Sequence, residues 1–562
     1  MGTLNAIWRL SARALLLLSL TPSAGSAQGL PVDFFDAREA TVDGVHNALF
    51  SGLTTCRGVV SAFLARIEEF NPVVNAIITL NPDALSIADD MDQQLATGNA
   101  TAPLFCIPIL LKDNYDAVGM NTTGGCLDLA GSRPTVDSPA AAAFKKAGAI
   151  ILGKTNLHEL ALEGLSVSSL GGQTVNPYDH TRTPGGSSGG SGAAVGASLA
   201  VFATGTDTVN SLRSPASANS LFSFRPTRGL ISRAGVIPIS YTQDTVGAMA
   251  RNLKDLAAAL TVMAGIGYDP NDNHTALAPQ EARGRDYTAA LAGGSLSGLR
   301  IGVLEGFFNN TPSPETTPVI DVMASVLSTL SAAGATLVNI TDPIYNAALI
   351  SAQLDVQTSE YRELLDAYLS NPQLQGDHPQ SFNDLYTSGR FLVIPAQYGY
   401  VNAAFTSSTS DAAYAAKQRG ITNLVTSLRK TFASTAGGLD AVVYPEQRNL
   451  VVKTGSPSQA GRNGILAALT GSPVVVVPAG FSPPSDEAPV GVPVGMEILG
   501  LPFTEAKLLN IARHVSDALG PVRKMPAFAN YSVEVRGYES VPVITPNRAN
   551  IDAAAYPVGR LS

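Results

Sequence analysis

Two serines on glycine-rich turns are the residues of this sequence best suited to chemistry. Ser187 lies in the run GGSSGGSGAAV, and Ser211 lies 24 positions later in GTDTVNSLRSP. Glycine runs let the main chain approach a ligand closely. Consecutive backbone N–H groups in such turns can hold a developing negative charge. We therefore expect both turns to approach a ligand, but neither serine has an obvious base beside it.

A lysine could supply the missing base. The apolar run FCIPILL, residues 105–111, predicts a buried strand, and Lys112 stands at its end. A lysine is a base only when neutral, so the pKa of Lys112 would have to fall from about 10.4 towards neutrality. Burial could lower the pKa that far. Taken alone, this segment is more typical of an ordinary strand-end lysine whose ammonium group reaches water.

Lys112 and the two serine turns occur in the order and spacing of a known family. Together they resemble the amidase signature family of serine hydrolases. The resemblance covers about residues 40–520 and includes AFKKAGAIILGKTNLHELA, TVNPYDHTRTPGG, SFRPTRGLISRAGVIP, QDTVGAMARNLKDLA, LTGSPVVVVPAG and VPVGMEILGLPFTEAKLL. It implies an α/β fold, a single large domain in which helices cover a central mixed β-sheet.

The resemblance also implies a Ser–Ser–Lys triad that hydrolyses amides. Ser211 would be the nucleophile and Lys112 the final base. Ser187, joined to Gly186 by a cis peptide bond, would relay protons between them and return one to the leaving amine. Water would then hydrolyse the acyl-enzyme. The implied substrate is a small carboxylic amide, cleaved at a non-peptide or terminal C–N bond.

The nucleophile turn departs from the family in one place. Most members carry Gly-Gly before the nucleophile, whereas this chain has Val209 and Asn210. The oxyanion hole would use the backbone N–H groups of Thr208, Val209, Asn210 and Ser211, which any side chain leaves in place. Valine tolerates positive φ poorly, so the turn must hold residue 209 at an ordinary φ. We expect Val209 to narrow the acyl entrance and to alter specificity.

Four further residues are expected to support the two turns. Asp207 and Arg213 bracket the nucleophile turn, and a buried Asp–Arg pair would fix it, since the planar guanidinium matches a carboxylate well. Gly186 and Ser188 flank Ser187 and would shape its loop.

Three other interpretations compete for these motifs. Residues 185–189 match the nucleophile elbow of α/β-hydrolases, which would make Ser187 the nucleophile of an esterase with a downstream histidine. An inactive, amidase-like binding protein is also compatible with Val209 and Asn210. Residues 148–155 match a phosphate-loop pattern, but a predicted helix precedes the first glycine and a predicted strand follows it, which argues against ATP binding.

The N-terminus has the pattern of a secretory signal peptide. Residues 1–27 contain Arg9 and Arg13, a short apolar core and SAGSA before Gln28, which predicts cleavage after Ala27 and a secreted, extracellular protein. The apolar core is too short to span a bilayer, so no stable membrane insertion is expected after removal, although an uncleaved anchor is the rival interpretation. Six N-x-[ST] sequons are compatible with a glycoprotein; they lie at Asn99, Asn121, Asn273, Asn309, Asn339 and Asn530.

Composition and motif spacing narrow the remaining choices. A net charge of −9 without basic runs argues against nucleic-acid partners. The three cysteines permit at most one disulfide, and neither they nor the histidines have metal-ligand spacing, so no metal or cofactor is expected. The oligomeric state cannot be predicted.

We expect residues 28–562 to form the amidase domain, with apolar strands at 149–152, 299–304, 335–340, 441–444 and 474–477. The helical, aromatic-rich stretch 345–435 is expected to cover the site and select the substrate. Residues 521–562 extend beyond the family resemblance, and the sequence assigns them no role.

Overall fold

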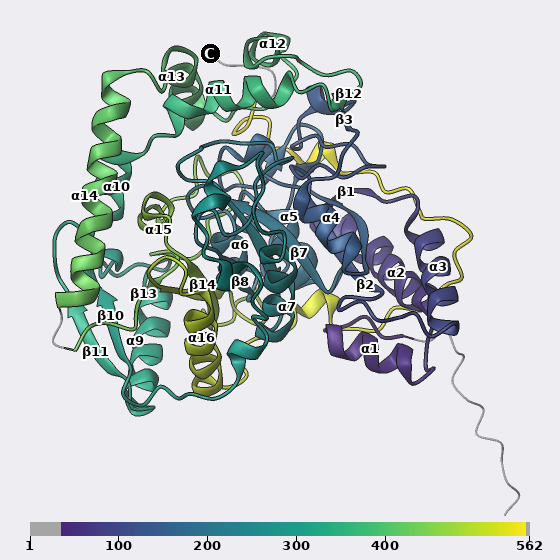
Figure 1. The fold of residues 1–562 in the computed structure, drawn as a ribbon, viewed down its shortest axis with the longest axis horizontal. Helices are drawn as coiled ribbons and strands as arrows, with labels where there is room; N and C mark the ends of the chain where they lie inside the picture. The colour runs from purple at the N-terminus through teal and green to yellow at the C-terminus, as the bar shows by residue number, and fades with distance from the viewer. Residues whose placement is uncertain (1–34, 435–436, 558–562) are drawn as a thin grey trace, which may run out of the picture.

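The computed structural model describes residues 35–434 and 437–557 (Figure 1). The predicted signal peptide, residues 1–27, lies outside this part of the chain. Within the described ranges, no helix is long and apolar enough to cross a membrane.

One mixed β-sheet forms the centre of the described structure. Its 11 strands lie in the order β1 (Ile77–Leu80), β4 (Ala149–Thr155), β2 (Ile107–Lys112), β7 (Phe202–Asp207), β9 (Thr245–Ala250), β8 (Phe222–Arg225), β14 (Val474–Phe481), β15 (Pro493–Leu499), β13 (Ala441–Pro445), β10 (Arg300–Leu304) and β11 (Thr336–Ile340). The pairs β2–β4, β2–β7, β10–β11 and β10–β13 are parallel, whereas the other neighbours are antiparallel. This arrangement confirms the predicted α/β fold with a central mixed sheet.

Helices pack around this sheet. They are α1 (Val42–Phe50), α2 (Cys56–Val74), α3 (Ala84–Ala96), α4 (Pro139–Lys146), α5 (Gly189–Gly196), α6 (Arg213–Ala218), α7 (Leu253–Ala264), α8 (Gln280–Arg283), α9 (Thr317–Ala332), α10 (Ala347–Leu354), α11 (Gln357–Leu369), α12 (Phe382–Ser388), α13 (Tyr398–Thr406), α14 (Ala412–Ser434), α15 (Ile465–Thr470) and α16 (Glu505–Leu519). Two short antiparallel pairs, β3 (Arg133–Pro134) with β12 (Leu374–Gln375) and β5 (Val167–Ser168) with β6 (Gly172–Gln173), lie outside the main sheet. Helices α1–α3 lie at one end of the molecule, and α10–α14 lie at the other end and across the top (Figure 1).

The apolar runs predicted as strands all lie in the main sheet. Those in β4, β10, β13 and β14 are mostly buried, whereas β11 at the edge of the sheet is partly exposed. β14 begins with four consecutive valines that are fully buried. Two of these strands extend well past their predicted ends. β14 continues past residue 477 to Phe481. β4 continues past residue 152 to Thr155, because Gly153 fits against β1, where an added Cβ would lie 2.2 Å from the Thr79 oxygen. Lys154 is also buried in the strand and lies 3.5 Å from the Asp113 carboxylate.

A disulfide and the C-terminal segment both hold helix α2 in place. A disulfide joins Cys56, at the start of α2, to Cys106, just before β2. The third cysteine, Cys126, is free and buried. The C-terminal segment 521–557 lies along α2 and the turn after it, where the Tyr531 hydroxyl donates to Glu69 and the Asn547 N–H donates to Asn75.

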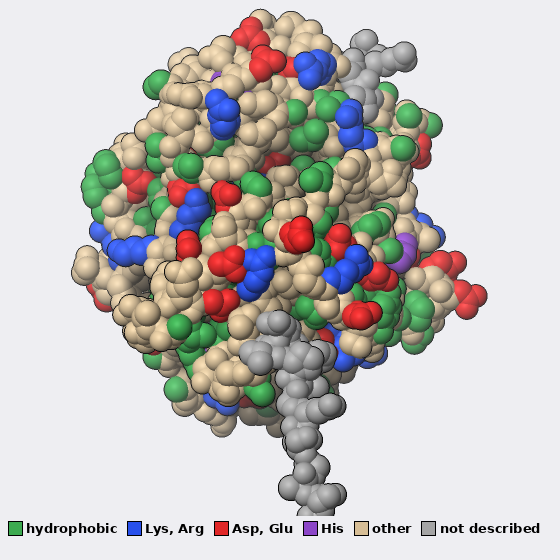
Figure 2. Space-filling model, turned by 90° about the vertical axis from the view of Figure 1, so that its right-hand side faces the viewer, with side chains coloured by type: hydrophobic (Ala, Val, Ile, Leu, Met, Phe, Trp, Pro, Cys, Tyr) green, Lys and Arg blue, Asp and Glu red, His purple; other side chains and the backbone are tan. Residues whose placement is uncertain are grey.

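Figure 2 shows the end of the molecule that carries α1–α3, with acidic and basic side chains interspersed over its surface. No face-wide basic patch is visible in this view. This mixture agrees with a sequence in which 45 acidic residues only modestly outnumber 36 basic ones.

Candidate active site

Lys112 is held at the end of β2 between two hydroxyl groups. Its Nζ atom lies 2.8 Å from the Ser187 Oγ atom and 2.7 Å from the Thr206 Oγ1 atom. The Lys112 side chain is completely buried. Thr206 lies on β7, the parallel neighbour of β2, so the sheet itself brings the two side chains together. The geometry therefore excludes the alternative in which the lysine reaches water.

The environment of Lys112 favours its neutral form. Burial lowers its pKa to about 7, and the negative charges of Asp207 and Asp244 only partly oppose this shift. At neutral pH a large share of Lys112 is therefore unprotonated. A neutral amine at hydrogen-bonding distance from a serine hydroxyl can accept its proton, as a general base must.

The loop around Ser187 is closely packed. The peptide bond between Gly186 and Ser187 is cis. A Cβ on Gly186 would lie 2.8 Å from the Gly164 oxygen, so only glycine fits there. The Ser188 hydroxyl donates to the backbone oxygen of Thr206. These contacts fix the Ser187 loop against β7.

Ser211 occupies the turn between β7 and α6 and opens onto a cleft. Its side chain is 9% exposed, whereas Ser187 is fully buried. The cleft has a volume of about 320 Å³. Its lining includes the turn residues Thr208, Val209, Asn210 and Ser211, the charged residues Glu163, Asp355, Arg448 and Arg462, and Gln357, Gln397 and Tyr400. A carbonyl carbon could therefore reach Ser211 from outside, whereas Ser187 lies behind it.

The second half of the proton relay stays a prediction. Among the hydrogen bonds of the described residues, none joins the Ser187 and Ser211 hydroxyls. No histidine side chain of the described chain hydrogen-bonds Ser187 either, although the His158 backbone N–H donates to the Ser187 carbonyl oxygen at 3.0 Å. Lys112 is thus the candidate base whose amine contacts the Ser187 hydroxyl.

Buried charges hold the nucleophile turn from behind. Arg213 Nε donates to Asp207 at 3.0 Å, and its Nη1 atom donates to Glu497 at 2.9 Å. All three side chains are completely buried. Arg213 also donates to the Val209 carbonyl oxygen, which orients that peptide. The Asp207–Arg213 pair that the sequence suggests is therefore present as a buried ion pair.

The turn accommodates its two non-glycine residues. Neither Val209 nor Asn210 is among the described residues with positive φ. Val209 therefore adopts the ordinary φ that an intact turn requires. The backbone N–H groups from Thr208 to Ser211 remain available for an oxyanion, and their catalytic role stays a prediction.

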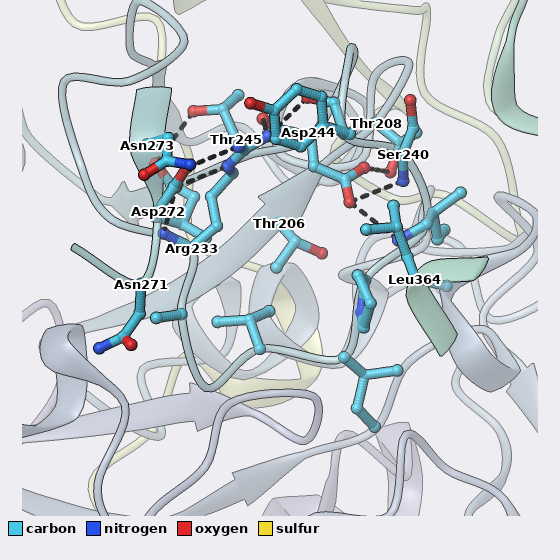
Figure 3. Close-up of a pocket in the computed structure, with 18 residues that line it drawn as sticks. Thr206, Thr208, Arg233, Ser240, Asp244, Thr245, Asn271, Asp272, Asn273 and Leu364 are labelled. Carbon is cyan, nitrogen blue, oxygen red and sulfur yellow. Dashed lines mark hydrogen bonds and ion pairs between the residues drawn. The ribbon is translucent and has the colours of Figure 1, made fainter. Parts of the chain in front are cut away.

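A second cavity lies on the Thr206 side of the turn (Figure 3). Its volume is about 200 Å³, and its wall includes Thr206, Thr208, Arg233, Asp244, Asp272 and the apolar segment 236–239. The polar groups are already paired, since Thr208 donates to Asp244 at 2.6 Å and Arg233 donates to Asp272 at 2.7 Å. Thr208 and Ala161 line both this cavity and the cleft, so the two spaces adjoin.

Sequence reasoning missed several residues of the site. Thr206 appears in the sequence as an ordinary strand residue, and its proximity to Lys112 follows only from the pairing of β2 with β7. Glu497 lies on β15 and Glu446 directly follows β13, both far from the turn in sequence, and neither carries a local signal. In the described chain, no group of three or more His, Cys, Asp or Glu residues could hold a metal ion.

Comparison with known proteins agrees with this geometry. The family model described as Amidase matches residues 58–509. The chain is 34% identical over 481 residues to a component of the glutamyl-tRNA(Gln) amidotransferase of Methylobacillus flagellatus, covering 81% of this chain and 91% of that protein.

Two solved structures are also similar. The native peptide amidase of Stenotrophomonas maltophilia has a TM-score of 0.74 and 33% identity, covering 87% of this chain and 99% of that one. An amidase family protein of Bacillus anthracis has a TM-score of 0.74 and 27% identity, covering 87% and 92%. The match spans the lysine, both serine turns and the whole sheet, and the chain therefore belongs to the amidase signature family.

Proposed function

We propose that this protein hydrolyses small carboxylic amides through an acyl-enzyme on Ser211. The observation that carries the proposal is the contact between the buried Lys112 amine and the Ser187 hydroxyl. Lys112 would take the proton of Ser187 while Ser187 takes that of Ser211, which then attacks the carbonyl carbon. The same groups would return a proton to the leaving nitrogen, because an amine leaves only when protonated.

The oxyanion turn would stabilise the tetrahedral intermediate. Backbone N–H groups between Thr208 and Ser211 would bind the negatively charged oxygen. The substrate would have two arms, since the cleft and the second cavity meet at Thr208. A cavity of about 150 Å³ holds benzene in other proteins, so one arm could be as large as a phenyl or branched alkyl group.

Hydrolysis of a small-molecule amide suits this chain better than amide transfer on a tRNA. The relative from Methylobacillus flagellatus is named as part of a glutamyl-tRNA(Gln) amidotransferase. This chain carries a net charge of −9, and contact with nucleic-acid phosphates depends on lysine and arginine. A small-molecule substrate fits the acidic chain better.

The proposal includes secretion. It rests on the signal-peptide pattern of residues 1–27 and on the Cys56–Cys106 disulfide, since disulfides persist mainly in oxidising compartments. Five of the six sequon asparagines are exposed, and the sixth, Asn309, is half-buried. Full-length protein expressed in a secreting host should appear in the medium without residues 1–27 and lose mass on glycosidase treatment; retention in the cell with an intact N-terminus would contradict this part.

The activity is tested by ammonia release. Purified protein should release ammonia from members of a panel of aryl, alkyl and peptide C-terminal amides, and Ser211→Ala should release none. Turnover that survives in Ser211→Ala but not in Ser187→Ala would favour the esterase-type nucleophile. A folded wild-type protein that binds amides without turnover would favour the inactive binding protein.

A further inference from the structure

The oxyanion turn makes a side-chain hydrogen bond to a residue that is distant in sequence. The Asn210 Nδ2 atom donates to the Glu446 Oε1 atom at 3.1 Å. Both side chains are buried, with exposed fractions of 1% and 0%. The two residues are 236 positions apart, so the bond joins the nucleophile turn to a strand end from a distant part of the chain. A glycine at position 210 could not make this contact.

Glu446 is itself rigidly placed. It follows the last residue of β13, its N–H donates to the Gly495 oxygen at 3.0 Å, and its carbonyl oxygen accepts from the Asn463 N–H at 3.3 Å. The Glu446 Oε2 atom is buried and has no hydrogen-bond partner among the described residues. The two backbone hydrogen bonds do not involve the Glu446 carboxyl group. Among the described residues, that carboxyl group is hydrogen-bonded through its Oε1 atom to the Asn210 amide.

The opposite side of the turn leaves Asn210 little room to move. A Cβ on Gly464 would lie 2.1 Å from the Val209 oxygen and 2.6 Å from the Asn210 Cβ atom. Arg213 donates to the Gly464 carbonyl oxygen at 3.0 Å and also to that of Val209. The turn is therefore closed in by Gly464 and Arg213, and the Asn210 amide is its link to Glu446.

We propose that Glu446 is a positioning residue for the oxyanion turn and acts through the Asn210 side chain. In this chain, the Asn210–Glu446 contact would supply part of the rigidity that aims the backbone N–H groups at the oxyanion. The inference rests on the proposed function, because an oxyanion for those N–H groups to bind forms only when a substrate carbonyl reacts.

The ionisation of Glu446 should make turnover depend on pH. Burial, helped by the nearby Glu497 and Asp207 carboxylates, raises the pKa of Glu446 to about 8, although Arg213 and the Asn210 amide partly oppose the shift. At neutral pH the carboxyl group is therefore mostly uncharged and accepts from Asn210. Above pH 8 it gains a negative charge beside the turn, which opposes the negative oxyanion. Turnover should then fall.

The test compares kcat, KM and pH profiles of four variants. Asn210→Ala and Glu446→Ala should each lower kcat about tenfold with KM changed less than about twofold, since the loss concerns the transition state. The double variant should be no worse than either single variant, because the two residues act as one unit. Glu446→Gln keeps the acceptor oxygen, so it should retain more kcat than Glu446→Ala and lose the fall in activity above pH 8.

Glu505 provides a matched control. It is equally buried, accepts from the Thr227 N–H at 2.8 Å, and has an unpartnered Oε2 atom, but it lies at the start of α16. Glu505→Gln should leave the fall in kcat above pH 8 (the alkaline limb of the pH profile) unchanged. If Glu446→Ala does not fold, Asn210→Ala and Glu446→Gln carry the test.

Additive losses, or an alkaline limb that is the same in wild type and Glu446→Gln, would overturn the inference. Wild-type protein that fails to form a covalent adduct at Ser211 would instead overturn the proposed function, so the two failures are distinguishable.

Discussion

The acid limb of the pH profile should report the ionisation of Lys112. Its pKa of about 7 stands against a usual value of 10.5. With the lower value, about half of the enzyme carries neutral Lys112 at pH 7, whereas the usual value would leave only about one molecule in 3,000 neutral. A general base works only in its neutral form, so kcat/KM should rise with pH and reach half its maximum near pH 7.

The assay is kcat/KM for a neutral amide between pH 5 and 10, with a substrate that does not itself titrate. The value should fall about tenfold per pH unit well below the midpoint. In Glu446→Gln, kcat/KM should still rise with pH on the acid side but should not fall above pH 8. Lys112→Ala should lose more activity on an amide than on an activated ester, because an ester needs less protonation of its leaving group. A rate that keeps rising tenfold per unit from pH 7 to pH 10, or amide activity unchanged in Lys112→Ala, would refute the reasoning.

Three further perturbations test other parts of the account. Ser211→Ala should remove essentially all turnover, whereas Ser187→Ala should leave a trace because the nucleophile and oxyanion turn survive; equal residual rates of ammonia release would contradict this. Val209→Gly should raise kcat/KM for bulky acyl groups only, and a uniform loss across acyl sizes would show that Val209 supports the turn instead. Replacing Cys56 and Cys106 by serine should lower the free energy of unfolding by about 2–4 kcal/mol, because the bond closes a long loop; an unchanged midpoint in denaturant unfolding would argue against that role.

The strands could be predicted because their burial leaves a local trace in the sequence. The run Val474–Val477 is apolar at every position because β14 is covered on both faces. β4 shows the limit of this signal. Its last residues include Lys154, whose ammonium group is buried against the Tyr115 carbonyl oxygen and near the Asp113 carboxylate, and a charged residue in a sequence normally marks the end of a buried strand.

The three residues of the candidate triad could be found from the sequence because their spacing is that of a family. Thr206, by contrast, contacts Lys112 only through the register of two parallel strands, which no local pattern specifies. The ion pair of Arg213 with Glu497 spans 284 positions, and no local pattern distinguishes that glutamate from the others. The three cysteines likewise allow three possible pairings, and only the fold brings Cys56 and Cys106 together.

The Asn210–Glu446 contact is another that no local sequence pattern predicts. The sequence marks Asn210 as a departure from the family, and that departure alone suggests altered specificity. The structure gives the asparagine a partner, because the end of β13 lies behind the nucleophile turn. The side chain that departs from the family pattern therefore has a hydrogen-bond partner that is remote in sequence.

The central claim is that Ser211 is a nucleophile activated by Lys112 through Ser187. Its most direct test is mass spectrometry of the protein after treatment with a fluorophosphonate, which forms a stable adduct with an activated serine. The account predicts one adduct on Ser211, formed much more slowly in Lys112→Met and absent in Ser211→Ala. An adduct on Ser187, or labelling of Ser211 at the same rate without Lys112, would contradict it.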